Sequence, residues 1–420
     1  MPKSRFSVAE TTDVTPGFVR LPTTILQLFG FLPPSSPRFE GRFLRICLRA
    51  LALLHVCGIY VGLLVNILRM IPFLTLPATG HANAIVYAFI WAPNFSEYGR
   101  PAAILTIFFF KANSCLQLYR TISSLSLTFT PEVRAKFHRE WKRLVTFFSL
   151  TAIILQMLQY LSLWMPTMIR VLTPPTLPIT SSEVSVPNTT SAPPTANKSL
   201  QLQMIPASMT WVSLYFRVST FAVSQQVLVL AIAAAVALRC LVLQRNLRIT
   251  QLRRDLQAGL LSKRTLLTQF EVMQKCRMTL CHFNEEIAGV FGYILFFSFA
   301  LDQTTLMGTL AEAIARPPAK VETAVNSCFF MLLFGCYSLA FFWPMVQVYD
   351  EDSKFYEVSQ AFYLTCEQNH ILVMGAGFFY FTRRLIANSM TFAASFGIVV
   401  YGIIQKSLTV PATNISQCNG

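Results

Sequence analysis

The chain has 420 residues, of which 54% are hydrophobic and only 13% are charged, and its mean hydropathy is +0.51. A soluble protein carries about 25% charged residues, so this composition excludes an ordinary soluble protein and predicts an integral membrane protein. The net charge of +15 is typical of basic loops on the cytoplasmic side of a membrane. No nucleic-acid-binding signature is present, and nucleic acid is not an expected partner.

The amino-terminal segment, residues 1–40, contains no apolar run long enough for a signal peptide, and we predict that it is cytoplasmic. The first apolar span follows at about 50–68. Positive charge before a first helix orients that helix from inside to outside, and here four arginines precede the span: Arg38, Arg42, Arg45 and Arg49.

A second apolar segment, about 84–117, carries Glu97 and Arg100 near its middle. Their i,i+3 spacing would let them pair on a helix. Ionisable groups at membrane depth suggest function, whereas a shorter span would leave the pair at its outer mouth, and both readings remain open. Only the second would make the sequon at Asn94 usable.

The segment 120–143 is basic and is predicted to be a cytoplasmic loop. A third span follows at about 144–169. The next stretch, 171–206, is rich in Pro, Ser and Thr and carries glycosylation sequons at Asn188 and Asn197. Glycosylation acceptors fit a loop on the outer face.

A fourth span is predicted at about 218–238, a fifth at about 287–310 and a sixth at about 324–348. Between the fourth and fifth, the segment 239–287 is basic and has leucines at helical spacing. This pattern predicts an amphipathic helix, either packed against neighbouring helices or subunits or lying on the membrane surface. An acidic stretch after the sixth span could face this basic segment: Asp350, Glu351, Asp352 and Glu357.

The last apolar span, about 386–405, has no acid or base in some twenty residues, which is the length a helix needs to cross a bilayer. Residues at three- and four-residue steps share one face of this helix: Ser395, Ile398, Tyr401 or Gly402, and Gln405. We predict that this face lines an ion pathway. A helix packed in lipid or protein with incidental hydroxyls is the alternative.

Seven crossings from an inside start place the carboxy terminus outside, where a third sequon stands at Asn414. The prediction is an all-α, polytopic membrane protein with seven transmembrane helices, a cytoplasmic amino terminus and an extracellular carboxy terminus. Residues 41–420 form a single transmembrane domain, with cytoplasmic helical extensions around 239–287 and 349–384.

Before the last span, a glycine, aromatic residues, a polar residue and an arginine follow one another: Gly377, Phe379, Phe381, Thr382, Arg383 and Leu385. This opening resembles the carboxy-terminal signature of arthropod gustatory receptors, a family related to insect odorant receptors. The signature ends in Thr-Tyr, five apolar residues and Gln-Phe. Aligned from Gly377, Ser395-Phe396 stands at the Thr-Tyr and Gly402 at the Gln; aligned from the far end, Gln405 matches but the Thr-Tyr does not.

The resemblance implies a ligand-gated, non-selective cation channel in the plasma membrane, assembled as a homo- or hetero-tetramer in which the seventh helices surround the pore. It further implies that a small-molecule tastant binds among the outer halves of helices two to six. Permeating cations and membrane lipid would be the other partners.

Aromatic and amide side chains suit a pocket for small organic ligands, although aromatics near a bilayer interface more often form a belt. The candidates in or near the outer halves of helices two to five, with Asp302 beside the last of them, are Tyr87, Trp91, Gln156, Tyr160, Trp211, Tyr215, Asp302 and Gln303.

Two other classes are weighed against a channel. A G-protein-coupled receptor would have its amino terminus outside, and a transporter would more often show paired, broken helices in two halves. An enzyme is not expected, because the five histidines are scattered and no catalytic or metal-binding spacing is present. No cofactor is expected.

Overall fold

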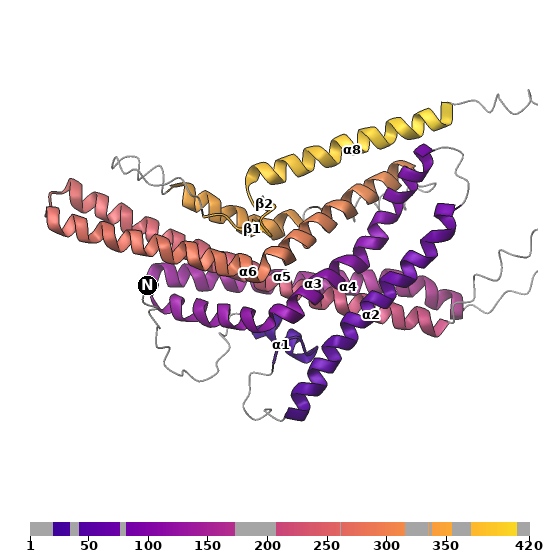
Figure 1. Ribbon diagram of the computed structural model, residues 1–420, viewed down its shortest axis with the longest axis horizontal. Coiled ribbons are helices and arrows are strands. Elements are labelled where there is room, and N and C mark those ends of the chain that lie inside the picture. Colours follow the sequence, from indigo (N-terminus) through magenta and orange to yellow (C-terminus); the bar gives the residue numbers. More distant parts are fainter. Residues whose placement is uncertain are drawn as a thin grey trace, which may run out of the picture.

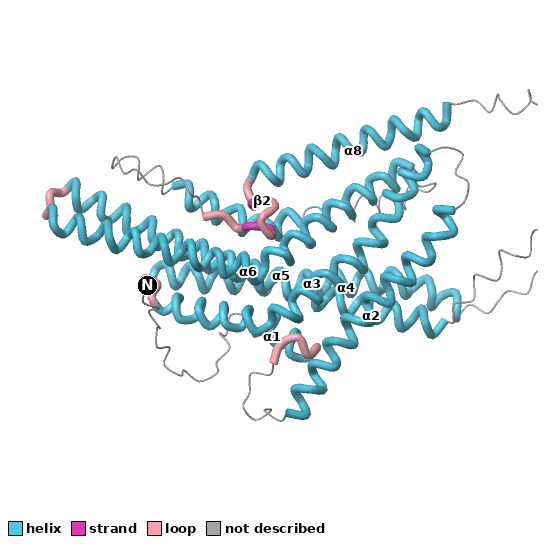
Figure 2. Tube along the Cα trace, in the orientation of Figure 1, coloured by secondary structure: helices cyan, strands magenta, loops and turns pink. Residues whose placement is uncertain are grey.

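The computed structural model describes residues 20–33, 42–75, 81–172, 207–260, 262–315, 335, 338–354 and 371–409. Nearly all of them are helical (Figures 1 and 2). The helices are α1 (Arg20–Leu28), α2 (Arg42–Thr75), α3 (His81–Leu127), α4 (Pro131–Leu172), α5 (Ala207–Gln257), α6 (Lys263–Ala315), an unlabelled helical segment at 338–354, and α8 (Arg383–Thr409).

Five stretches within the described residues are long and apolar enough to cross a membrane: Phe43–Leu68, Tyr98–Leu127, Tyr215–Gln257, Glu271–Ala311 and Arg383–Ile403. They lie on α2, α3, α5, α6 and α8, and so they overlap the predicted first, second, fourth, fifth and seventh spans. The predicted third span falls on α4. Most of the predicted sixth span lies outside the described residues.

Helices α5 and α6 are 51 and 53 residues long, far longer than the roughly 20 residues that cross a bilayer. Only 258–262 separates them, so the two helices form an extended antiparallel hairpin (Figure 1). The predicted amphipathic helix at 239–287 is therefore helical as expected, but it consists of the continuations of both spans around a tight turn.

Two sequence predictions about connecting segments were wrong. The predicted loop 120–143 is helical except at 128–130, because α3 and α4 extend past their apolar parts. The predicted helical extension 349–384 stops being helical after 354 in the described residues and contains a β-hairpin. Its strands β1 (Met374–Gly375) and β2 (Phe379–Tyr380) pair antiparallel. The backbone reverses there through positive φ angles of 51° at Ala376 and 82° at Gly377, which a helix cannot accommodate.

Helix α5 forms the centre of the molecule, with 83% of its most apolar window buried. A run of small residues lets its neighbours approach closely, as is usual between membrane helices: Ala231, Ala233, Ala234, Ala235 and Ala237, all buried. Helix α3 packs along α6, and α4 packs along α5.

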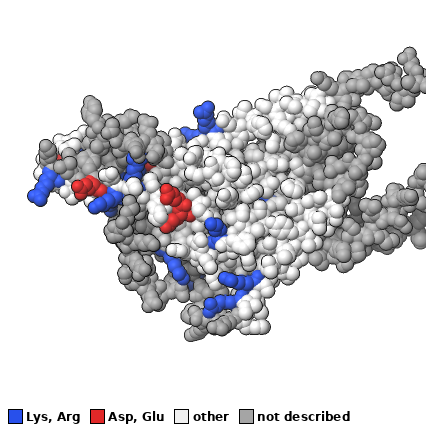
Figure 3. All heavy atoms as spheres, viewed as in Figure 1, with Lys and Arg blue, Asp and Glu red and all other residues white. Residues whose placement is uncertain are grey.

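The charged residues are segregated along the molecule. On the face seen in Figure 3, Lys, Arg, Asp and Glu gather over the half that includes the α5–α6 hairpin, whereas the described surface of the other half is uncharged. A molecule with one charged end and one apolar body fits a protein that lies partly in a bilayer and partly in water.

Candidate functional site

The β-hairpin connects the helical body to α8, and its aromatic residues fasten it. Phe379 and Phe381 pack against Phe299 of α6, with ring centroids 5.0 and 5.9 Å apart, and Phe381 stacks on Phe342 of the 338–354 segment at 5.0 Å. Such aromatic contacts stabilise a junction beyond the area they bury. The aromatic residues of the sequence signature are therefore packing residues that fix where α8 starts.

Helix α8 begins with an amino-terminal cap. The Thr382 hydroxyl accepts a hydrogen bond from the Leu385 N–H at 3.2 Å, and its carbonyl accepts one from the Ile386 N–H at 3.3 Å. This arrangement satisfies N–H groups that a helix start leaves unpaired. Further along, the hydroxyls of Ser389 and Thr391 donate to carbonyls one turn earlier, so they can lie among apolar residues at little cost.

One narrow stripe of α8 packs on the rest of the chain. Its buried members are Ala393, Gly397 and Val400, at steps of four and three residues. A Cβ added at Gly397 would lie 2.7 Å from Leu310 Cδ2 of α6. The missing side chain therefore allows the two helices to approach closely.

The opposite side of α8 is uncovered. Ser395, Ile398, Tyr401 and Gly402 are all exposed, with Ile398 74% and Tyr401 55% accessible. Only 17% of the α8 window is buried, against 83% for α5. Gln405 lies on the same helix, but the structure does not describe its side chain. The structure thus places the predicted pore-facing residues on a surface that the chain itself does not cover.

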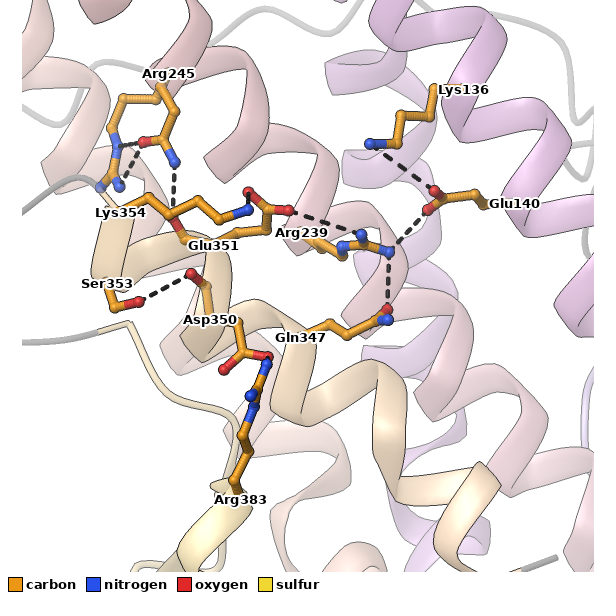
Figure 4. A network of polar contacts seen from close by, with 11 residues as sticks. Lys136, Glu140, Arg239, Arg245, Gln347, Asp350, Glu351, Ser353, Lys354 and Arg383 are labelled. Atoms are coloured by element: carbon orange, nitrogen blue, oxygen red, sulfur yellow. Dashed lines mark hydrogen bonds and ion pairs between the residues drawn. The ribbon is translucent and has the colours of Figure 1, made fainter. Parts of the chain in front are cut away.

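The first residue of α8 is tied to the helical segment 338–354, as Figure 4 shows. The Arg383 guanidinium donates to Asp350 Oδ2 from Nε at 3.2 Å and from Nη2 at 2.9 Å. It also lies over the Trp343 ring, 5.9 Å from the centroid. Both partners belong to the 338–354 segment, so its position and that of the α8 start are linked.

That segment is in turn tied to α5 by two arginines. Arg245 donates to Asp352 at 2.9 Å, and both side chains are only 1% exposed. Arg239 lies 3.7 Å from Glu351 and donates to Gln347 at 2.8 Å. The prediction that the acidic stretch faces the basic segment is confirmed for Asp352 and Glu351. Asp350 instead pairs with Arg383 of α8, and Glu357 lies outside the described residues.

The same network reaches α4 and the base of the hairpin. Arg239 donates to Glu140 of α4 at 3.0 Å, and Lys136 lies 4.0 Å from that carboxylate. Asp352 Oδ2 accepts the Ile371 N–H at 2.8 Å. Ion pairs and hydrogen bonds therefore run from α4 through α5 and the 338–354 segment to α8 (Figure 4).

A second polar site lies between α3 and α6. Arg100 Nε is 2.7 Å from Asp302 Oδ1, and Arg100 also donates to Ser298 at 3.1 Å. The guanidinium lies over the Phe221 ring of α5, 5.5 Å from its centroid. Arg100 is thus paired with Asp302, one of the predicted ligand-pocket residues. The side chain of Glu97, the predicted i,i+3 partner of Arg100, is not among those that the structure describes. Two opposite charges on separate apolar spans were the signal for this pairing.

The other ligand-pocket candidates are only partly placed. Gln303 is half-buried beside Asp302. Tyr215 is 55% exposed and its ring lies 6.1 Å from His55, so the structure does not bring it to Asp302. The remaining candidates lie on helices α3, α4 and α5, and the structure does not describe their side chains. They are Tyr87, Trp91, Gln156, Tyr160 and Trp211. The sequons Asn188, Asn197 and Asn414 also fall outside the described residues, and Asn94 lies within α3.

The insect olfactory receptor OR5 from Machilis hrabei matches with a TM-score of 0.56 at 14% sequence identity, over 91% of this chain and 97% of that chain. The chain has the fold of an insect olfactory receptor. The structure of the same receptor in complex with eugenol matches this chain with a TM-score of 0.55 at 13% identity, over 92% of this chain and 98% of that chain. No protein-family profile matches the sequence, and no curated protein matches it.

The fold and the five apolar stretches together make the chain a multi-pass membrane protein. Among the described residues, α8 is the last helix and the least buried of the five candidate spans.

Proposed function

We propose that the protein is a gustatory-type chemosensory receptor that works as a ligand-gated, non-selective cation channel in the plasma membrane. A small-molecule tastant binds among the outer halves of helices two to six, and binding opens a pore lined by α8. The amino terminus is cytoplasmic and the carboxy terminus extracellular, and Asn188, Asn197 and Asn414 carry glycans on the outer side.

The observation that carries this proposal is the uncovered face of α8. Beyond its first turn, helix α8 buries a narrow stripe, Ala393, Gly397 and Val400, against its own chain. Most of its remaining described surface is left for lipid, for other subunits or for water. Ser395 and Gly402 place small or hydroxyl groups on that surface, and Ile398 places a large apolar side chain between them. Rings of such residues from several subunits would form a water-accessible wall with a hydrophobic constriction, which is one way in which channels gate.

The proposed assembly is a tetramer, of identical or of mixed subunits, with four copies of α8 around one axis. This arrangement would cover on each subunit the surface that a single chain leaves open. The olfactory receptor solved with eugenol supports a small organic ligand for this fold, and we carry that ligand class over to this chain.

The test is expression of the full chain in cells without related receptors, with calcium imaging and whole-cell recording against a panel of sugars, bitter compounds and odorants. We expect a ligand-dependent current carried by several cations that persists when GDPβS fills the cell. A response abolished by GDPβS would contradict the channel proposal and favour signalling through a G protein.

The pore assignment has a separate test by cysteine accessibility. Ser395→Cys and Ile398→Cys should make the ligand-evoked current sensitive to a cationic methanethiosulfonate reagent, because both positions face water in the proposed pore. Ala393→Cys, on the buried stripe, is the matched control and should stay insensitive. Modification of Ala393→Cys alone would reverse the assignment of the two faces.

A further inference from the structure

Helix α4 presents an outward stripe that changes from cationic to apolar along its length. Its members recur at steps of three and four residues and are all exposed. They are Arg139 and Arg143, followed by Phe147, Leu150, Ile154 and Met157, of which the last four are between 48% and 59% accessible. Such a stripe matches a lipid leaflet, with headgroups at one end and hydrocarbon beyond.

A wide hollow lies at the boundary between the two parts of this stripe. It is shallow and open, and its described lining comes from one short stretch of α4: Lys142, Arg143, Leu144, Thr146 and Phe147. The apolar groups supply nearly all of the wall, and the two cations stand beside it. The hollow therefore combines a place for a hydrocarbon chain with a place for a negative charge.

The two cations are available to a ligand. Among the described residues no carboxylate lies within ion-pair distance of Lys142 or Arg143. Glu140, one turn earlier, is already shared by Arg239 at 3.0 Å and Lys136 at 4.0 Å. A headgroup phosphate or carboxylate would provide the missing counter-charge, since Arg and Lys both bind such oxygens.

We propose that this part of α4 binds an anionic phospholipid of the inner leaflet. Its headgroup contacts Lys142 and Arg143, and one acyl chain lies in the hollow against Phe147 and continues along Leu150 and Ile154. The assignment rests on the orientation given under the proposed function, in which this end of α4 is cytoplasmic. Anionic lipids are concentrated on that side of the plasma membrane.

A free anion fits the site less well than a lipid. Two cations alone would suit inorganic phosphate, but they adjoin a hollow that is almost entirely apolar and opens onto an apolar stripe. A soluble anion would leave that hollow in contact with water, whereas an acyl chain would fill it.

The experiment measures which lipids stay with the purified full chain. The protein is reconstituted in phosphatidylcholine containing a minority of phosphatidylserine and extracted in mild detergent, and the retained lipids are quantified by mass spectrometry. We expect phosphatidylserine to be enriched over the bulk ratio on the order of tenfold, because each basic residue near the headgroups contributes favourably. The double variant Lys142→Gln/Arg143→Gln should fall to the bulk ratio.

The matched control is Arg253→Gln/Arg254→Gln, which removes the same charge from exposed positions near the end of α5 and should retain the wild-type enrichment. Phe147→Gln keeps both cations and should weaken retention by removing the apolar wall. Excess soluble glycerophosphoserine should not displace the lipid.

Three results would overturn the proposal: bulk-ratio lipid on the wild type, equal loss in the control, or displacement by glycerophosphoserine, which would indicate a site for anions alone. The measurement requires no ion current, so a failure of the proposed channel function would leave its outcome intact.

Discussion

Arg100 and Asp302 are 202 residues apart in the sequence and meet in the contact between α3 and α6, with side chains that are 5% and 4% exposed. Bringing two charges out of water is costly, and their attraction repays that cost only when the geometry is good and the remaining hydrogen bonds are made. Here Ser298 and the Phe221 ring also contact the guanidinium, but its Nη1 makes no hydrogen bond in the described part of the chain. We therefore expect the pair to fix the position of α3 relative to α6 rather than to add much to the free energy of unfolding.

Removing one partner of this pair should be severe. Asp302→Ala would leave Arg100 buried without its counter-charge, and we expect it to destabilise the protein by about 3–5 kcal/mol. Thermal unfolding of the detergent-solubilised protein, followed by size-exclusion chromatography, measures the effect. The double variant Arg100→Met/Asp302→Leu should recover most of the loss, and a double variant as unstable as Asp302→Ala would argue against the ion pair as the cause.

Gln303 offers a separate prediction at the neighbouring position. Its side chain is half-buried and uncharged, so its removal leaves no buried charge without a partner. Gln303→Ala should leave the unfolding temperature nearly unchanged and shift the ligand concentration for half-maximal current. Unchanged dose–response curves would remove this residue from the pocket.

At the scale of elements, α8 is coupled to its neighbours by the Arg383–Asp350 pair. Arg383 is 69% exposed, and exposed ion pairs contribute only about 0.2–1 kcal/mol. We therefore expect Arg383→Ala or Asp350→Ala to shift the half-maximal ligand concentration by at most about fivefold, without loss of surface expression. The charge-swapped variant Arg383→Asp/Asp350→Arg should return toward wild type, and additive effects in this cycle would show that the pair does not couple the two elements.

The packing of α8 on α6 gives a stronger effect. Gly397→Leu would place a branched side chain where even a Cβ lies 2.7 Å from Leu310. Overpacking of this kind typically costs about 1–3 kcal/mol, and we expect altered gating or reduced surface expression. Ala394→Leu, one turn before Ile398 on the exposed side, is the control and should be tolerated in surface-biotinylation assays.

Hydropathy predicted the spans at 50–68 and 386–405 well, because a helix in lipid requires an unbroken apolar run and both stretches have one. It did not predict where helices end. Helix α3 runs on to Leu127 through polar residues, and α5 runs on to Gln257, since tertiary contacts and local propensity can prolong a helix in water. The β-hairpin was missed because strands of two residues carry no periodicity. The sequence signal was the glycine at position 377, which takes a positive φ in the turn.

The candidate site was predicted unevenly for a similar reason. The face of α8 follows from helical spacing alone, so Ser395, Ile398 and Gly402 could be grouped in advance. The contact between Arg100 and Asp302 could not be predicted from the sequence, because the two residues are 202 positions apart and become close only through folding. The contact between the acidic stretch and the basic part of α5 was predicted. Several carboxylates close together in the sequence require cations nearby, and the basic segment supplies most of them.

At the scale of the whole molecule, the face seen in Figure 3 has its charges toward one end and an uncharged described surface toward the other, and the proposed orientation in the membrane leads to a prediction about topology. An epitope tag on the amino terminus should be reached by antibody only after permeabilisation, whereas a carboxy-terminal tag should be reached on intact cells. The reverse pattern would require the opposite orientation and would restore the G-protein-coupled reading.

The continuity of α5 from Ala207 to Gln257 has a mechanical consequence. A helix of 51 residues is about 77 Å long at 1.5 Å per residue. If it moves as one rod, a tilt of about 5° at one end displaces the other end by roughly 7 Å, with no hinge needed between them. Such a movement would carry a small adjustment at one end of α5 to the ion pairs of Arg239 and Arg245 with the 338–354 segment, and through Asp350 and Arg383 to the start of α8, the helix that we propose lines the pore.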